Sequence, residues 1–498
     1  MFKINIIGSG FSGLAAAAYL AKSGSSVTIL EKNAHIGGRA RAFETNNGFM
    51  FDMGPSWYWM PDAFESFFNS FGKSTSDYYE LKKLDPGFQV FFGKGEVIQI
   101  PDNKEELLAL FESIEKGSGD KLNTFLQEGE FKYRVGMQKL AYKPALSWLE
   151  FANYEVINGA IRSHMFRSIK NYVRSFFTDE RLVAIMEFPV LFLGARPKNI
   201  PALYSLMNYA ALELGTYYPM GGMRKITEGM EQLAREMGVD IITNCEVSKI
   251  NATEKLVSSV ETTKGTISCD ALLATGDYHH IEQKLLDPQH RNYKTSYWDK
   301  KTLAPSCLIF YVGVSKKVKK LIHHNLFFDR DFEKHSFEIY DEPQWPTEPL
   351  FYVCCPSKTD DTVAPKGMEN LFILIPIAPG LTDTDELRES YYKKVMQRLE
   401  KECDDSINDH VVYKKSYCIN DFVADYHAFK GNAYGLANTL SQTAVFKPSI
   451  RNKHLKNLFY AGQLTVPGPG VPPALISGKI SAQQTINYLK KINHEAIV

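Results

Sequence analysis

The feature that most restricts the fold of this chain is a glycine-rich turn near its start, between an expected strand and an expected helix. Residues 3–7 (KINII) form an apolar, β-branched run that is typical of a buried parallel strand. Residues 8–13 (GSGFSG) follow with the spacing G-x-G-x-x-G, and residues 14–21 (LAAAAYLA) favour a helix. A second apolar run, residues 27–30 (VTIL), predicts the next strand, and Glu31 comes directly after it.

Each glycine of this turn has a physical task. Gly8 permits the tight turn after the strand, Gly10 lets the backbone approach a bound group, and Gly13 lets the helix pack against the strand. The helix N-terminus offers unpaired N–H groups and the positive end of its dipole to an anion. Glu31, 18 residues after Gly13, is placed to accept hydrogen bonds from a ribose hydroxyl pair. The pattern therefore predicts a dinucleotide-binding site formed by Gly8, Ser9, Gly10, Phe11, Ser12, Gly13, Glu31 and Lys32.

A second glycine pair follows the acidic residue and favours FAD over NAD as the dinucleotide. Residues 37–41 read GGRAR, and such a turn leads the backbone back beside the diphosphate. Arg39 adds a positive charge there, for which a plain NAD dehydrogenase has no need. The motif FDMGPS gives another point of close backbone approach. The residues expected to contact FAD in these two segments are Gly38, Arg39, Gly54, Pro55 and Ser56.

Near the C-terminus a second strand, turn and helix follow the same logic. Residues 457–462 (NLFYAG) predict a short strand, and a turn rich in Gly and Pro comes after it. Residues 475–489 carry apolar side chains at helical spacing. A helix N-terminus behind such a turn favours contact with an anion or a flavin ring. The contact residues expected there are Gly462, Val471 and Pro472.

The middle of the chain supplies elements that complete the cofactor domain. Residues 225–237 have the spacing of an amphipathic helix, and residues 239–247 predict one strand after it. Short strands are expected over residues 256–261, at residue 267 and over residues 271–274. This rhythm predicts an α/β fold with a Rossmann-type domain.

Composition restricts the partners and the location. Lys plus Arg (57) equals Asp plus Glu (57), so charge gives no reason to expect nucleic acid as a partner. The seven cysteines include no C-x-x-C pair and predict neither a disulfide framework nor a zinc site. No stretch approaches the roughly 20 apolar residues that span a bilayer, and the first residues do not form a signal peptide. We therefore expect a cytoplasmic protein, in solution or at a membrane surface.

Four motifs, in one order, resemble those of a known family. They are GSGFSG with Glu31, GGRAR, FDMGPS and AGQLTVPGPGVPPALISG. Together they resemble the bacterial carotenoid desaturases of the phytoene desaturase family, within the amine-oxidase-like flavoproteins. The versions found here are most similar to the Bacteroidetes-type phytoene desaturases. One departure is Gly462-Gln463, since many of the wider group have Gly-Asp there.

The resemblance implies a division of the chain into three parts. These are an FAD-binding domain (residues 1–75, 216–285 and 441–498), a mixed-sheet substrate domain (76–104 and 286–440) and a helical, membrane-facing region (105–215). It also implies that the backbone at Val247 meets the adenine. Residues 105–114 and 121–142 carry apolar residues at helical spacing, in agreement with the helical region.

The implied reaction is dehydrogenation of an acyclic C40 carotenoid, phytoene towards lycopene. A hydride passes to flavin N5 and the neighbouring carbon loses a proton, so the protein supplies position and dryness. A quinone or oxygen is implied as the electron acceptor, and a membrane surface as a peripheral partner. An apolar slot would hold the polyene by burial. The aromatic residues expected at its mouth are Trp57, Tyr58, Trp59, Phe64, Phe67 and Phe68.

Neither a catalytic base nor a metal site is predicted. Adjacent histidines occur at His279–His280 and at His323–His324. Neighbouring side chains point apart on most backbones, which argues against a shared metal ion. Asp277 is expected at a strand end in a structural role.

Three other functions remain open from the sequence. The motifs do not distinguish phytoene from a hydroxylated or later carotenoid. An amine oxidase would need an aromatic cage for an amine and no lipid-sized tunnel. A prenyl-lipid escort protein without flavin chemistry would share the fold, although every phosphate-side glycine and Glu31 is present.

Overall fold

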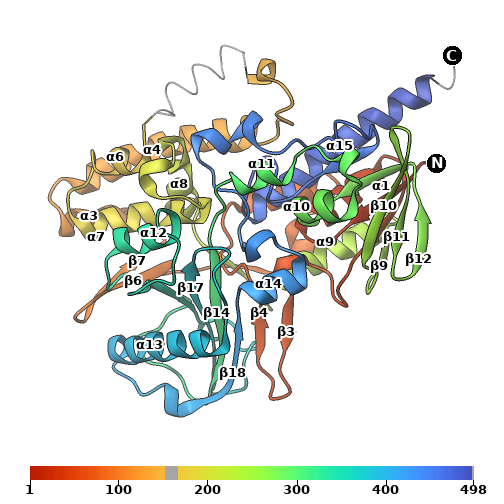
Figure 1. Cartoon of the computed structure of the whole chain (residues 1–498). Helices are drawn as coiled ribbons and strands as arrows, with labels where there is room; N and C mark the ends of the chain where they lie inside the picture. The colour runs from red at the N-terminus through yellow and green to blue at the C-terminus, as the bar shows by residue number, and fades with distance from the viewer. Residues whose placement is uncertain (152–166, 496–498) are drawn as a thin grey trace.

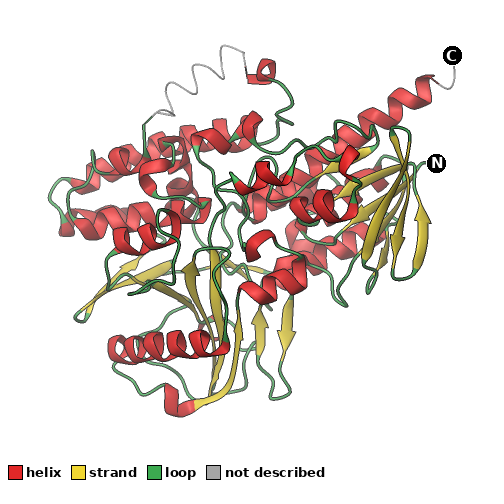
Figure 2. Ribbon diagram, in the orientation of Figure 1, coloured by secondary structure: helices red, strands yellow, loops and turns green. Residues whose placement is uncertain are grey.

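The structure, a computed structural model, describes residues 1–151 and 167–495, and its elements gather in three parts (Figure 1). A parallel sheet with its helices lies at the right of the view, a second sheet lies below, and a group of helices lies at the upper left. Figure 2 shows the strands in separate sheets with helices packed between and around them. The α/β fold class expected from the sequence is therefore confirmed.

The first sheet has five strands, and all its pairs are parallel. In spatial order they are β19 (Leu458–Tyr460), β13 (Ala271–Ala274), β1 (Lys3–Ile7), β2 (Ser26–Leu30) and β9 (Asp240–Ile242). On one face, α1 (Phe11–Lys22) packs against both α9 (Arg224–Glu236) and α15 (Val471–Glu495). The other face packs against a three-stranded antiparallel sheet of β10 (Val247–Thr253), β11 (Leu256–Thr262) and β12 (Gly265–Ser268). In open parallel sheets of this kind, ligands bind beyond the carboxyl ends of the strands.

Two expected elements have different bounds in the structure. The single strand predicted over residues 239–247 is wrong, because the chain leaves one sheet after β9 and enters the other at β10. Between them Asn244 has φ +50°, and the Cys245 N–H donates to the Glu31 carbonyl at 2.8 Å. The last helix begins at Val471, earlier than predicted. Prolines fit into its first turn, because the N–H groups of a first turn have no acceptor within the helix.

The second sheet has seven strands and is mixed. In spatial order they are β18 (Val411–Tyr417), β14 (Ser306–Val314), β17 (Glu369–Ile377), β16 (Phe351–Cys354), β15 (His324–Phe327), β6 (Phe88–Gly93) and β7 (Glu96–Ile100). Only the β15–β6 pair is parallel among those described. Helix α13 (Asp385–Cys403) covers one face. The other face belongs to a core shared with the helical part.

The helical part contains α3 (Lys104–Ile114), α4 (Ser118–Tyr133), α6 (Ile169–Val173), α7 (Glu180–Glu187) and α8 (Leu206–Leu212). A wider helical turn over Arg134–Leu140 continues α4, so helices at both predicted segments are confirmed. Part of the predicted helical region, residues 152–166, lies outside the described residues. Among the described helices, none is long and apolar enough to cross a membrane.

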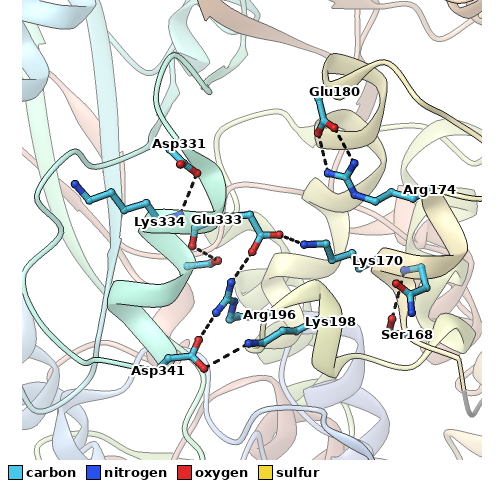
Figure 3. A network of polar contacts seen from close by, with 12 residues as sticks. Ser168, Lys170, Arg174, Glu180, Arg196, Lys198, Asp331, Glu333, Lys334 and Asp341 are labelled. Atoms are coloured by element: carbon cyan, nitrogen blue, oxygen red, sulfur yellow. Dashed lines mark hydrogen bonds and ion pairs between the residues drawn. The ribbon is translucent and has the colours of Figure 1, made fainter.

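Short elements connect these parts. They are β3 (Ala42–Glu44), β4 (Met50–Asp52), α2 (Pro61–Asn69), β5 (Leu81–Lys83), β8 (Tyr217–Pro219), α10 (Tyr278–His280), α11 (Thr295–Asp299), α12 (Phe332–Tyr340) and α14 (Ile419–Tyr426). Ion pairs fasten α12 to the helical part (Figure 3). Arg196 bonds both Glu333, at 2.5 Å, and Asp341, while Lys170 also pairs with Glu333 at 2.5 Å. One side of α12 is thus held by charge, and the other faces the cavity described below.

Candidate cofactor and substrate site

The three glycines of the turn after β1 have the separate roles that the sequence predicts. Gly8 has φ +99°, a conformation that favours glycine. A Cβ placed on Gly13 would lie 2.1 Å from the Gly8 carbonyl oxygen, so this glycine lets α1 sit on the strand. A Cβ on Gly10 would meet only the Gly38 Cα, at 4.0 Å. Gly10 therefore faces open space rather than packed atoms.

That open space belongs to a cavity of about 280 Å³ in front of the N-terminus of α1. Gly10 is the N-cap of α1, and the helix has no side-chain cap and no acidic residue in its first turn, which leaves N–H donors for an anion. Most residues expected to contact FAD line this one cavity although they come from six separate segments. They are Gly8, Ser9, Gly10, Phe11, Ser12, Glu31, Lys32, Gly38, Arg39, Gly54, Pro55, Val247, Gly462 and Val471.

Three expected contact residues lie elsewhere. Gly13 does not line the cavity, because within α1 it packs against the Gly8 carbonyl oxygen and Thr275 Oγ1. Ser56 and Pro472 line a neighbouring, larger cavity instead. Gln463, the departure from Gly-Asp, lines the smaller cavity and donates to Asn432 Oδ1 at 3.1 Å.

Glu31 is buried, and both of its carboxylate oxygens accept hydrogen bonds within the protein. One oxygen accepts from the N–H and the hydroxyl of Ser9, at 2.9 and 2.6 Å. The other accepts from the N–H of Asn33, at 2.8 Å. The carboxylate at the end of β2 thus braces the glycine turn as well as lining the cavity.

Arg39 supplies the test of whether the cavity suits a diphosphate. The Arg39 side chain is half-buried, donates to the Asn432 carbonyl at 3.3 Å and lies 4.9 Å from the Tyr426 ring centre. Its Nε is buried without a hydrogen-bond partner among the described residues. Burial lowers the pKa of Arg39, with Tyr426 and Asp277 acting in the opposite direction. A half-buried cation whose Nε is a buried, unused donor beside a cavity fits an anionic ligand, and the residues present therefore fit FAD.

Residues that sequence reasoning did not assign to the site close the far side of the same cavity. His280 stacks on His427 with ring centres 3.9 Å apart, and His427 Nε2 pairs with Glu246 at 2.7 Å. Burial lowers the pKa of His280 to about 3, so this ring is neutral. Asp277 caps α10 and accepts from the Phe429 N–H at 3.1 Å, and burial raises its pKa. In the sequence, the position of Asp277 directly after an expected strand is the feature that could have assigned it to this site.

The larger cavity has a volume of about 1120 Å³ and a mainly apolar, aromatic wall. Trp57 and Trp59 line it, as expected. The expectation is wrong for the other four aromatics, since Tyr58, Phe64, Phe67 and Phe68 pack in the core around α1. Tyr58 points away from its neighbours because side chains alternate along an extended segment. The phenylalanines of α2 face α1, where Phe67 meets Tyr19 with ring centres 5.8 Å apart.

The two cavities meet at a shared wall. Six residues line both, and they come from the FDMGPS motif, the second sheet, the loop after α14 and the C-terminal turn: Gly54, Pro55, Leu374, Tyr434, Gly470 and Val471. A cofactor that fills the smaller cavity thus ends where the larger one begins. Redox chemistry at this wall would act on whatever the larger cavity holds.

Few polar groups adjoin the larger cavity. Its wall includes His335, whose Nε2 donates to the Pro376 carbonyl at 2.9 Å while its Nδ1 accepts from the Leu350 N–H at 3.0 Å. Burial lowers the pKa of His335 to about 4. Three apolar lining residues are exposed to solvent at one end: Trp148 (61%), Phe446 (48%) and Leu440 (43%).

Comparison with known proteins identifies the family of this chain and several relatives. Residues 11–486 match the family described as flavin containing amine oxidoreductase. A carotenoid 3,4-desaturase of Haloarcula japonica is 41% identical, over 97% of this chain and 98% of its own length. A zeta-carotene-forming phytoene desaturase of Myxococcus xanthus is 30% identical, over 98% and 94%. Cyclohexylamine oxidase from Brevibacterium oxydans shares the fold with a TM-score of 0.61 and 15% identity, covering 98% of this chain and 99% of that one.

Proposed function

This chain belongs to the flavin containing amine oxidoreductase family and has FAD as its cofactor, and from this premise we propose that it desaturates an acyclic C40 carotenoid. The observation that carries the proposal is the large apolar cavity that meets the dinucleotide cavity at Gly470 and Val471. Its volume of about 1120 Å³ exceeds the roughly 300–1,000 Å³ of pockets for drug-sized ligands. An amine oxidase needs only a small cage, so the volume favours a lipid-sized substrate.

The proposed cofactor contacts are the expected residues that line the smaller cavity, with Arg39 and the start of α1 at the diphosphate. Gly13 has a packing role, and Ser56 and Pro472 act from the substrate side of the wall. The three-part division of the chain stays part of the proposal. The escort function is disfavoured, because Arg39 offers an unused buried donor where a diphosphate is expected.

When bound, FAD supplies a hydride acceptor at its N5. The chain itself holds the polyene in place by burying it, at roughly 25 cal/mol for each Å² of apolar surface. The aromatic wall excludes water, and ring faces stabilise positive charge that develops along the polyene. Lys143 is the one lysine or arginine among the described lining residues, and its ammonium group donates to the Glu150 carbonyl.

Two substrates within this class are candidates. The first is phytoene, converted towards lycopene. The second is a later or hydroxylated carotenoid, and it is favoured by the higher identity to the 3,4-desaturase, 41% against 30% for the phytoene desaturase.

We further propose that the substrate enters from a membrane surface. The support is the exposed apolar end of the cavity, where Trp148 and Phe446 pack edge to face with ring centres 5.1 Å apart. A carotenoid is insoluble in water, so entry at a bilayer avoids exposing it. A quinone from the same bilayer, or oxygen, is the proposed electron acceptor.

The test is expression of the full chain in two hosts, one that accumulates phytoene and one that accumulates lycopene. We expect pigments with additional conjugated double bonds in at least one host, measured by their absorption spectra. Colour change in the phytoene host supports the first substrate, and change only in the lycopene host supports the second. No new pigment in either host, with holoprotein present, would contradict the proposal.

A further inference from the structure

Three buried side chains with metal-binding atoms converge behind the wall of the larger cavity. They are His323, His324 and Cys354, and one ligand atom from each lies within 4.8 Å of the others. None of the three is more than 4% exposed. They form the one such cluster among the described residues.

The strand pairing explains why they meet. His324 and Cys354 are directly opposite each other in the antiparallel pair of β15 and β16, so their side chains share one face of the sheet. His323 precedes the strand, and its ring centre lies 4.5 Å from that of His324. The expectation that these adjacent histidines point apart is therefore wrong, because the regular alternation of a strand begins only at His324.

The hydrogen bonds of the rings leave the same nitrogen free on each. His323 Nδ1 lies 2.7 Å from Thr359 Oγ1, and His324 Nδ1 lies 2.6 Å from the Tyr352 hydroxyl. Since the Tyr352 hydroxyl donates to Ser56 Oγ, at 3.0 Å, it accepts from His324 Nδ1–H. Both Nε2 atoms are buried with no hydrogen-bond partner in the described part of the chain. A histidine that donates through one nitrogen and leaves the other bare is arranged as a metal ligand usually is.

We propose that His323 Nε2, His324 Nε2 and Cys354 Sγ bind a zinc ion. Zinc takes nitrogen ligands at about 2.0–2.1 Å and thiolate at about 2.3 Å in a tetrahedron, which sets the ligand atoms about 3.3–3.6 Å apart. The three side chains already place one ligand atom each within 4.8 Å of the others, which is about 1.2–1.5 Å more than this spacing. On binding, the Cys354 thiol releases its proton to solvent, and a zinc–sulfur bond replaces the S–H bond.

The surroundings suit the resulting charge. Two neutral imidazoles and one thiolate leave a single positive charge on the zinc site. The Asp360 carboxylate acts electrostatically on His323, and the Asp52 carboxylate acts on Cys354. The Tyr352 hydroxyl, which contacts His324 Nδ1, is also within hydrogen-bond reach of the thiol.

The site is structural rather than catalytic. Trp57 stacks on His324 with ring centres 3.9 Å apart and an interplanar angle of 12°, and Tyr352 also lines the cavity. A metal ion would therefore fix two side chains of the substrate wall from behind. This inference does not depend on which molecule the cavity binds.

The first measurement is the metal content of the full-length holoprotein, produced in zinc-supplemented medium and dialysed against EDTA. We expect about one zinc per chain by mass spectrometry of the metals. X-ray absorption at the zinc edge should show sulfur at about 2.3 Å and nitrogen at about 2.0 Å. Less than a tenth of a zinc per chain, another metal in stoichiometric amount, or a shell without sulfur would each overturn the proposal.

The second measurement compares two adjacent cysteines. Cys354→Ala should lower the zinc content at least tenfold. Cys355→Ala is the matched control, because Cys355 is equally buried but packs on the opposite side of the sheet, near Ser357 Oγ at 3.5 Å. It should keep one zinc per chain. Retention of zinc in Cys354→Ala, or equal loss in both variants, would refute the assignment, and His323→Gln replaces Cys354→Ala if the latter does not fold.

Discussion

Replacing Gly10 by valine separates the folding of the glycine turn from its use as a binding surface. Gly10 has φ −73° and ψ −177°, which any residue adopts, and an added Cβ meets only the Gly38 Cα at 4.0 Å. The apoprotein should therefore fold with a loss of less than about 1 kcal/mol, since valine is a poorer N-cap residue than glycine. The methyl groups would instead occupy the cavity in front of α1.

The cost to FAD binding follows from two terms. Forcing extra methyl groups into a filled site costs about 1–3 kcal/mol. Displacing the diphosphate from one N–H donor costs a further 1.5–3 kcal/mol or so, because the bond is charge-assisted. The sum of about 2.5–6 kcal/mol corresponds to a loss of affinity of about 10²–10⁴-fold.

The assay is titration of each apoprotein with FAD, followed by flavin fluorescence, together with thermal unfolding of the apoproteins. Gly13→Ala is the control, because its Cβ would lie 2.1 Å from the Gly8 carbonyl oxygen. That variant should lose about 3 kcal/mol or more of folding stability. The reasoning is refuted if Gly10→Val binds FAD within threefold of the unmodified chain while its apoprotein unfolds at the same temperature.

Three further outcomes are expected. Glu31→Ala should weaken FAD binding by about 1–3 kcal/mol, since the carboxylate braces Ser9 and lines the cavity; unchanged affinity by the same titration would count against it. Arg196→Ala should lower the free energy of unfolding by about 1–2 kcal/mol, a modest loss because its partners are a third or more exposed. Lys198→Ala, whose pair spans 3.6 Å, should cost less than about 0.5 kcal/mol in the same denaturation series, and equal losses would contradict the role of Arg196. His335 keeps a pKa of about 4 when folded, whereas the unfolded chain takes up a proton below about pH 6.5, so stability is lost as pH falls between these values. Between pH 7 and pH 5 the free energy of unfolding should fall by about 2 kcal/mol less in His335→Gln than in the unmodified chain. Parallel curves of unfolding free energy against pH for the two proteins would disprove this role of His335.

The local parts of the site could be predicted from the sequence, because the residues that determine their conformation lie in one short segment. The tight turn at Gly8 and the packing at Gly13 depend on neighbours only a few residues away, and both are found as predicted. The strand expected over residues 239–247 failed because a tertiary event, the passage from one sheet to another, interrupts it.

The parts that could not be predicted depend on contacts between distant segments. His280 meets His427 only because α10 and α14 pack on the same cavity. Tyr58 and Trp57 have similar side chains, and which of them faces the cavity depends on the strand-like alternation around them. The residue types alone do not predict which of these two side chains points into the cavity.

The central claim is that a polyene in the larger cavity reacts with FAD at the shared wall, and anaerobic reduction of the bound flavin tests it most directly. The holoprotein would be mixed with phytoene, with lycopene and with a primary amine, each in detergent micelles, and flavin absorbance followed. The account predicts bleaching by a carotenoid, with one added double bond for each flavin reduced, and none by the amine. Bleaching by the amine alone, or an unchanged flavin spectrum with both carotenoids, would contradict it.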